Sequence, residues 1–261
     1  MVADVFALVS AGGSPGVTTA AIALALTWPT TAIVAECDPS GGDILAGLLA
    51  GHMPVARGLM EHAIEVGRDS DAAAVGLGAQ LVPLDAARSR MLLPGLTDPR
   101  QAAGLAPAWA AVTATLTAQQ ADVLADCGRL DAGAGQPTAV LTAARTVALV
   151  LRPTLRQVWS ARSRVEILTQ LLGGRDRLVL LLTGSGTHSA RDVAQALELP
   201  VAAMLPHDIR AAALLSDGTG PRGRIRTSPL LRAAGAAGAA LRQHAGAGAT
   251  QFFSIEPSAP R

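Results

Sequence analysis

A glycine-rich segment near the N-terminus has residue types that could hold a phosphate group. Residues 11–19 read Ala-Gly-Gly-Ser-Pro-Gly-Val-Thr-Thr and follow the apolar run 5–9. A phosphate-binding loop has this context, because it wraps the anion in backbone N–H groups and leads into the N-terminus of a helix. Glycines permit close backbone approach, whereas Pro15 removes one N–H donor. The residues expected to contact a nucleotide here are Gly12, Gly13, Ser14, Gly16, Val17, Thr18 and Thr19.

The same segment lacks the lysine of the usual phosphate-loop pattern, G-x-x-x-x-G-K-[ST]. Gly16 and Thr18 match, but Ala11 replaces the first glycine and Val17 occupies the lysine position. The lysine would contact the β- and γ-phosphates and offset the charge of the departing γ-phosphoryl group. None of the 21 basic residues is a lysine, so no other lysine can replace it. Losing such a contact costs about 10²–10³-fold in rate or affinity, so we expect weak binding of ATP or ADP and little hydrolysis.

The glycine pattern also fits two other interpretations. Any Rossmann-like protein can have a tight strand-to-helix turn at this place. Ala11, Gly13 and Gly16 also approximate the G-x-G-x-x-G pattern of dinucleotide sites, and Glu36 follows about 20 residues later, where an acid would take the ribose hydroxyls. An NAD-dependent oxidoreductase is therefore an alternative. The chain contains no tyrosine and its five histidines are scattered, which does not favour hydride chemistry.

The elements that must position these residues alternate between strand-like and helical patterns. The runs 147–151 and 178–182 are continuously apolar, as strands covered by helices on both faces must be. We expect an α/β fold with a doubly wound, mostly parallel sheet of about seven strands and helices on both faces. Ligands bind such sheets beyond the carboxyl ends of the strands. Strands are expected at 5–9, 31–35, 80–84, 122–125, 146–151, 177–182 and 201–205, and helices at 18–27, 43–50, 106–117, 154–172, 189–197 and 228–244.

Length and charge favour one domain that does not bind nucleic acid. The 261 residues are 50% hydrophobic, enough for a large buried core. We expect one domain over residues 1–246 and a flexible C-terminal tail over 247–261. The net charge is +1, from 21 basic and 20 acidic residues, so the strong positive field of a nonspecific nucleic-acid binder is missing. No direct, specific nucleic-acid binding is expected.

Cysteine use and hydropathy indicate a cytoplasmic protein. The two cysteines, Cys37 and Cys127, are expected to be reduced and buried. The N-terminus has no signal-peptide pattern, and no uncharged apolar run reaches the roughly 18 residues of a membrane span. We therefore expect no membrane span.

A second group of chemically informative residues follows the second expected strand. Residues 36–43 read Glu-Cys-Asp-Pro-Ser-Gly-Gly-Asp. This segment resembles the D-x-D-P-x-G-G-D segment of MinD/ParA proteins, a family of ATPases with a deviant phosphate loop. The resemblance implies that Asp38 is the catalytic residue, because the matching acid helps to organise magnesium and the attacking water. Glu36 replaces the first acid conservatively. The resemblance extends in consistent order over residues 4–217.

A third acidic position ends the strand expected at 122–125. Asp126 follows this apolar run directly, and the segment is similar to a Walker B strand, whose aspartate holds magnesium through water. Thr18, Asp38 and Asp126 could thus converge on one Mg²⁺ ion, a hard cation that prefers oxygen ligands. The alternative is that Asp126 only caps the following turn.

Two later loops extend the resemblance. Residues 151–154 resemble the family's strand-to-helix turn with a proline, and the loop containing Pro206 and Asp208 resembles the segment that lies against the adenine base. Thr183 and Gly184 stand where the family has the asparagine that reads adenine. The family's additional signature lysine aligns with Gly12, so both lysines are replaced.

These observations lead to an expected function and one further alternative. We expect a MinD/ParA-like nucleotide-binding protein or pseudo-ATPase that acts as a positioning or scaffold factor for partition, division, pilus or secretion machinery. The resemblance implies a protein partner and a possible homodimer. The alternative is an active ATPase in which an arginine of the basic run 222–226 replaces the lysine: Arg222, Arg224 or Arg226.

Overall fold

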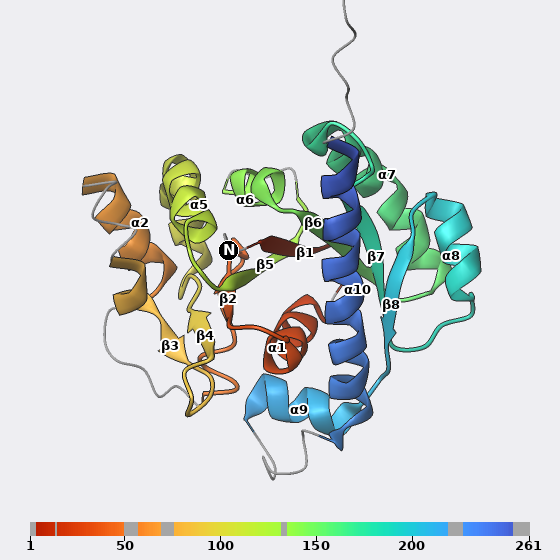
Figure 1. The fold of residues 1–261 in the computed structure, drawn as a ribbon, viewed down its shortest axis with the longest axis horizontal. Coiled ribbons are helices and arrows are strands. Elements are labelled where there is room, and N and C mark those ends of the chain that lie inside the picture. Colours follow the sequence, from red (N-terminus) through yellow and green to blue (C-terminus); the bar gives the residue numbers. More distant parts are fainter. Residues whose placement is uncertain are drawn as a thin grey trace, which may run out of the picture.

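Eight strands form a single sheet in the computed structural model, in the order β3-β4-β2-β5-β1-β6-β7-β8 (Figure 1). All neighbouring strands are parallel except β3 and β4, which are antiparallel. The chain thus forms the predicted doubly wound, mostly parallel α/β sheet. The strands are β1 (Val5–Ser10), β2 (Ala32–Glu36), β3 (Val82–Pro83), β4 (Arg90–Leu93), β5 (Asp122–Arg129), β6 (Thr146–Leu151), β7 (Leu178–Thr183) and β8 (Val201–Leu205).

The structure describes residues 4–13, 15–49, 57–68, 76–131, 135–218 and 227–252, with side chains of the last segment described as far as residue 246. No helix in these segments is both long and apolar enough to cross a bilayer.

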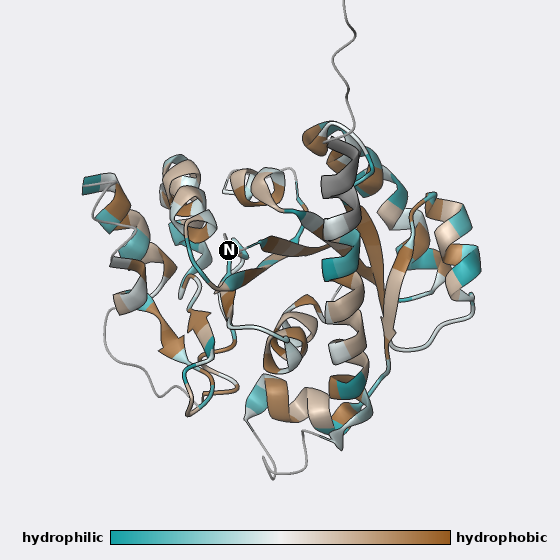
Figure 2. Ribbon diagram, viewed as in Figure 1, coloured by the Kyte–Doolittle hydropathy of each residue, from teal (hydrophilic) through white to brown (hydrophobic). Residues whose placement is uncertain are grey.

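Helices cover both faces of the sheet because successive strand side chains point to opposite faces. In β1, Val5, Ala7 and Val9 enter one buried cluster, whereas Phe6 and Leu8 enter the other. Figure 2 shows the central strands as the most hydrophobic part of the ribbon. One face carries α1 (Val17–Thr27), α9 (Ile209–Asp217) and α10 (Pro229–Phe252), and the other α2 (Leu59–Arg68), α4 (Ala102–Leu105), α5 (Trp109–Thr117), α6 (Thr138–Ala143), α7 (Leu155–Leu172) and α8 (Ala190–Leu197).

The alanine-rich helix α10 packs closely beside α1 (Figure 1). A Cβ atom built on Gly238 would lie 3.1 Å from the Trp28 ring, so a small residue is needed there. The Trp28 indole N–H donates to Asp122 Oδ2 at 2.8 Å, and Arg242 of α10 donates to the same oxygen at 2.8 Å. Small residues and this shared acid therefore fix α10 against the sheet.

Several elements differ from the prediction. The strand β4 was not expected, and β3 has only two residues instead of the range 80–84. Residues 44–49 form turns instead of the helix predicted over 43–50. A Cβ atom on Gly47 would lie 1.7 Å from the Ser216 carbonyl oxygen, so this segment is set by close packing against α9. The last helix, predicted over 228–244, continues to Phe252.

Candidate functional site

A cavity of about 870 Å³ opens beside the carboxyl end of the central strand β1. The chain leaves β1 through α1 and reaches β2 on one side, while β6 lies on the other side. A reversal of this kind is where doubly wound sheets bind ligands. Segments far apart in the sequence form the walls: the residues after β1, the turns after β2, the end of β5 and the C-terminal end of α9. Lining residues include Ser10, Gly13, Pro15, Gly16, Val17, Thr18, Thr19, Asp38, Asp43, Gly47, Arg129 and Asp217.

The segment 11–19 has the backbone of a close-fitting turn. Gly13 and Gly16 have φ angles of +64° and +92°, in a region that residues other than glycine rarely adopt. Gly16 is the N-cap of α1 and no side chain caps this end, so the first N–H groups of the helix are not taken by a side-chain cap. Of the contact residues predicted in this segment, all but Gly12 and Ser14 line the cavity, and Ser14 lies outside the described residues.

Val17 and Thr183 occupy the positions where a lysine and an asparagine were expected, and both make contacts within the protein. Val17 is 6% exposed and belongs to the same buried cluster as α1 and α10. The Thr183 hydroxyl, at the end of β7, donates to the Pro15 carbonyl at 2.7 Å. The position expected to read adenine therefore ties β7 to the turn.

Asp126 is connected to the cavity through Thr18. The Thr18 hydroxyl donates to the Asp126 carboxylate, and the Gly128 N–H donates to Asp126 Oδ1 at 3.0 Å. Asp126 is 2% exposed and does not itself line the cavity. Burial, with a further contribution from the charges of Asp38 and Asp43, raises the pKa of Asp126 to about 6. The Asp126 carboxylate thus binds the backbone at Gly128 and also contacts the Thr18 side chain.

Asp38 lies directly against the end of β5. Its Oδ1 accepts the Ser40 N–H at 2.7 Å, and a Cβ atom on Gly128 would lie 1.9 Å from its Oδ2. Only a glycine at 128 leaves room for this carboxylate, which lines the cavity. In the described part of the chain, no three acidic, histidine or cysteine side chains are arranged to hold a metal by themselves. A cation among Thr18, Asp38 and Asp126 would need further oxygen ligands.

Glu36 points away from any ligand and into the protein. Its Oε1 accepts the Ile44 N–H at 2.9 Å and its Oε2 accepts the Gly95 N–H at 3.0 Å. Glu36 is 2% exposed, and burial raises its pKa to about 7. This carboxylate is therefore occupied in holding two loops together, and it does not take the ribose role considered for a dinucleotide site. Cys37 and Cys127 are both buried and free, as predicted.

The predicted adenine-side residues do not line this cavity. Pro206 is exposed, and Asp208 caps α9 by accepting the Ala211 N–H at 3.0 Å. The opposite end of α9, at Asp217, lines the cavity instead. Arg222, Arg224 and Arg226 lie outside the described residues, as do residues 253–261 of the predicted tail.

Arg129 is a cavity residue that the sequence patterns did not indicate. It is the one basic residue among those that line the cavity in the described segments. Its Nη2 lies 2.6 Å from Asp131 Oδ2, in an ion pair whose arginine side chain is 57% exposed. Its position three residues after Asp126 on the same strand is a signal that could have drawn attention to it.

Comparison with known proteins identifies the fold. No family model matches the chain, and no curated protein matches it in sequence. A ParA family ATPase from Chlorobium tepidum TLS is similar in structure, with 16% identity, a TM-score of 0.72 and coverage of 91% of this chain and 98% of that one. The structure of MinD complexed with Mg-ADP from Pyrococcus horikoshii OT3 is also similar, with 17% identity and a TM-score of 0.67. The match covers 94% of this chain and 98% of that one. A chain of the MinC:MinD cell division protein complex of Aquifex aeolicus is similar with 14% identity and a TM-score of 0.65. The match covers 99% of this chain and 99% of that one. The chain has the fold of the MinD/ParA-type P-loop ATPases.

Proposed function

We propose that this chain, with its MinD/ParA fold, is a nucleotide-binding protein with little or no ATPase activity that positions or scaffolds a cellular machine. The observation that carries the proposal is the cavity at the end of β1, where the turn over 11–19, Thr18 and Asp38 face one space. The volume of about 870 Å³ is in the range of small-molecule sites. A fold alone does not establish function, so the argument rests on these residues.

The residues present fit a magnesium nucleotide. Backbone N–H groups of the turn and the start of α1 would hold the phosphates of ATP or ADP. Thr18, Asp38 and Asp126 supply hard oxygen donors. Burial is the main cause of the raised pKa of Asp126, and the charges of Asp38 and Asp43 add to it; a bound cation would offset these charges. When bound, Mg²⁺ would neutralise part of the phosphate charge. Pro206 and Asp208 remain predicted contacts to the adenine side.

The same cavity gives a reason to expect slow ATP hydrolysis. Val17 is packed into the core at the position of the phosphate-contacting lysine, and valine has no charge to offer the γ-phosphate. Asp38 is proposed as the residue that orients the attacking water in the residual turnover. Glu36 gives no support to the alternative of an NAD-dependent oxidoreductase, because its carboxylate is bound by backbone N–H groups.

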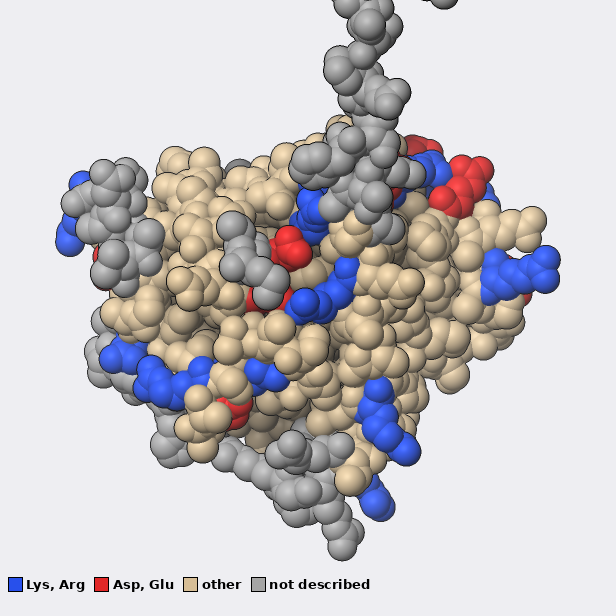
Figure 3. All heavy atoms as spheres, in the orientation of Figure 1, with Lys and Arg blue, Asp and Glu red and all other residues tan. Residues whose placement is uncertain are grey.

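The role as a positioning factor rests on the resemblance and on the structural neighbours. The MinD of Aquifex aeolicus is found in a complex with MinC, and by analogy we propose a protein partner for this chain, with a homodimer as a further possibility. We propose a cytoplasmic location and a part in partition, division, pilus or secretion machinery. Direct nucleic-acid binding is not proposed. On the face drawn in Figure 3, basic side chains lie in several separate places and form no broad patch.

Calorimetric titration and a turnover assay test this function together. We expect ATP with Mg²⁺ to bind weakly, NADH not to bind, and phosphate release to stay near background. Asp38→Ala should reduce Mg²⁺-dependent ATP binding, whereas the exposed α7 acid Glu166 is a control whose change to alanine should have no effect. Fast, Mg²⁺-dependent turnover that Asp38→Ala abolishes would show an active ATPase instead.

A further inference from the structure

The cavity is lined by more acidic than basic side chains. Three carboxylate residues line it, namely Asp38, Asp43 and Asp217, against one described basic residue, Arg129. ATP and ADP carry several negative charges, and their phosphates are usually met by lysine or arginine. Val17 is buried and the chain contains no lysine. Arginine is therefore the side chain of this protein that can bring a permanent positive charge to the phosphates.

Arg129 lies beside the start of the phosphate-loop segment. It pairs in register with Ser10, the last residue of β1, and the Leu130 N–H donates to the Ser10 carbonyl at 2.9 Å. The chain enters the segment 11–19 directly after Ser10. The backbone position of Arg129 is therefore fixed by the same strand pair that positions the turn, and Arg129 is among the residues that line the cavity.

The guanidinium of Arg129 is held from one side. Its Nε and Nη2 donate to Asp131 Oδ2 at 2.9 and 2.6 Å. A guanidinium has five N–H donors, and these contacts involve only one edge of it. Asp131 thus orients the group, while the arginine side chain stays 57% exposed. An arginine held in this way can form charge-assisted, bidentate contacts to phosphate oxygens.

We propose that Arg129 supplies the phosphate-binding charge that the missing lysine would have supplied. The ligand class is a nucleoside di- or triphosphate, and the inference rests on the proposed function because it concerns the same cavity. Asp131 acts as a positioning residue for the guanidinium. The basic run 222–226 is then not needed for phosphate binding.

Titration of the full-length protein with ATP and Mg²⁺ tests Arg129. We expect Arg129→Ala to weaken ATP binding about tenfold or more, as for loss of a partly exposed charge-assisted contact. Arg129→Lys should restore part of the affinity, because a point charge replaces the planar fork. Sodium tripolyphosphate should displace ATP from the wild type, and its own affinity should fall in Arg129→Ala to a similar extent.

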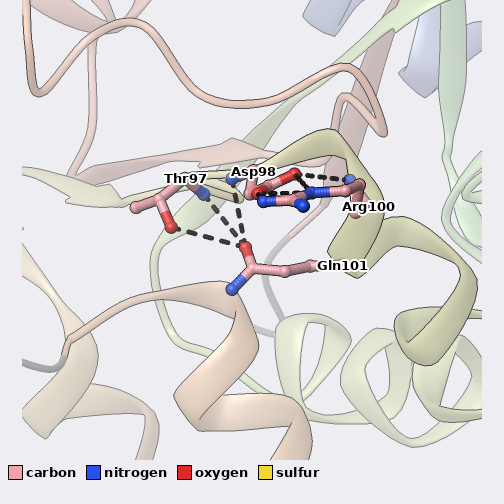
Figure 4. A network of polar contacts seen from close by, with 4 residues as sticks. All are labelled: Thr97, Asp98, Arg100 and Gln101. Carbon is pink, nitrogen blue, oxygen red and sulfur yellow. Dashed lines mark hydrogen bonds and ion pairs between the residues drawn. The ribbon is translucent and has the colours of Figure 1, made fainter.

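Arg100 offers a matched control. Like Arg129, it is exposed and paired with an aspartate two residues away, since its Nε donates to Asp98 Oδ2 at 2.8 Å (Figure 4). It does not line the cavity. Arg100→Ala should therefore leave ATP affinity within twofold of the wild type.

The outcomes separate this inference from the proposed function. If the wild type binds ATP and Arg129→Ala behaves like Arg100→Ala, the role of Arg129 is overturned and the nucleotide site stands. Loss of affinity in Arg224→Ala, with none in Arg129→Ala, overturns it as well. A wild type that binds no nucleotide overturns both proposals. Should Arg129→Ala fail to fold by circular dichroism, the longer neutral variant Arg129→Gln decides by the same criterion.

Discussion

Replacing Asp126 by asparagine should make the ligand-free protein more stable at neutral and alkaline pH. Asp126 is 2% exposed and lies near the carboxylates of Asp38 and Asp43, so its ionised form is disfavoured. Asparagine has nearly the same shape. Its carbonyl oxygen can accept the Gly128 N–H, and its amide can donate to the Thr18 hydroxyl, so both existing contacts have a counterpart. The substitution thus removes the charge and leaves few polar groups unpaired.

The size of the gain follows from the pKa of Asp126, which burial raises from 3.8 to about 6. Because the folded-state pKa is the higher one, the folded protein binds more protons between these values, and its free energy of unfolding falls as the pH rises through them. At 1.36 kcal/mol per pKa unit, the full penalty above pH 6 is about 3 kcal/mol. At pH 5 only part of this penalty has developed, because Asp126 is still mostly protonated in the folded protein. The advantage of Asp126→Asn should therefore grow by about 1.4 kcal/mol between pH 5 and pH 8.

Urea unfolding at pH 5 and pH 8, followed by tryptophan fluorescence, measures this difference. Trp28 and Trp109 are buried and report on the two faces of the sheet. The exposed Asp4 provides the control, and Asp4→Asn should change the free energy of unfolding by less than about 0.5 kcal/mol at either pH. The reasoning is refuted if Asp126→Asn is less stable than the wild type at pH 8, or if its advantage is the same at both pH values.

Two further substitutions test how the loops are held. Glu36→Ala should expose the Ile44 and Gly95 amides, which both bind the Glu36 carboxylate, so their hydrogen exchange should accelerate at least about tenfold; unchanged protection would contradict the assigned contacts. Gly128→Ala should destabilise the protein by about 1–3 kcal/mol in thermal unfolding, because its Cβ would lie 1.9 Å from Asp38 Oδ2 and its φ is +60°. Gly174→Ala, which has no neighbour within 4 Å, should have a much smaller effect, and equal effects would rule out this steric explanation.

Most of the sheet could be predicted because its strands carry local signals. The predicted range 146–151 matches the bounds of β6, since a continuous apolar run between polar segments marks a buried parallel strand. The predicted range 201–205 matches β8, an apolar strand at the edge of the sheet that is only partly buried. The strand β4 was missed because it is short and begins with Arg90, which hides its apolar character. Its place in the sheet depends on pairing with β2, a contact between distant segments.

The sequence also predicted which residues would share one edge of the sheet. Thr18 and Asp38 follow parallel strands, and the carboxyl ends of such strands meet at the same edge. Asp126 was expected directly after a strand over 122–125, but β5 continues to Arg129 and Asp126 lies within it. The structure brings Thr18 into contact with Asp126. It places Asp38 against Gly128, two residues after Asp126 on β5. Whether these residues hold Mg²⁺ stays a prediction.

Tertiary structure decided which polar groups face the cavity. Glu36 and Asp38 are two residues apart on the same segment, yet Glu36 is 2% exposed and bound to backbone amides, whereas Asp38 lines the cavity. The residues that capture Glu36 come from the turn at 44 and from the loop after β4. Arg129 reaches the cavity only because β5 pairs with β1. Motif spacing therefore predicted a glycine-rich turn after β1 with Val17 at the position of the usual lysine, since these are local properties. The orientation of each charge depended on neighbours from distant parts of the chain, because burial and hydrogen bonding are set by packing.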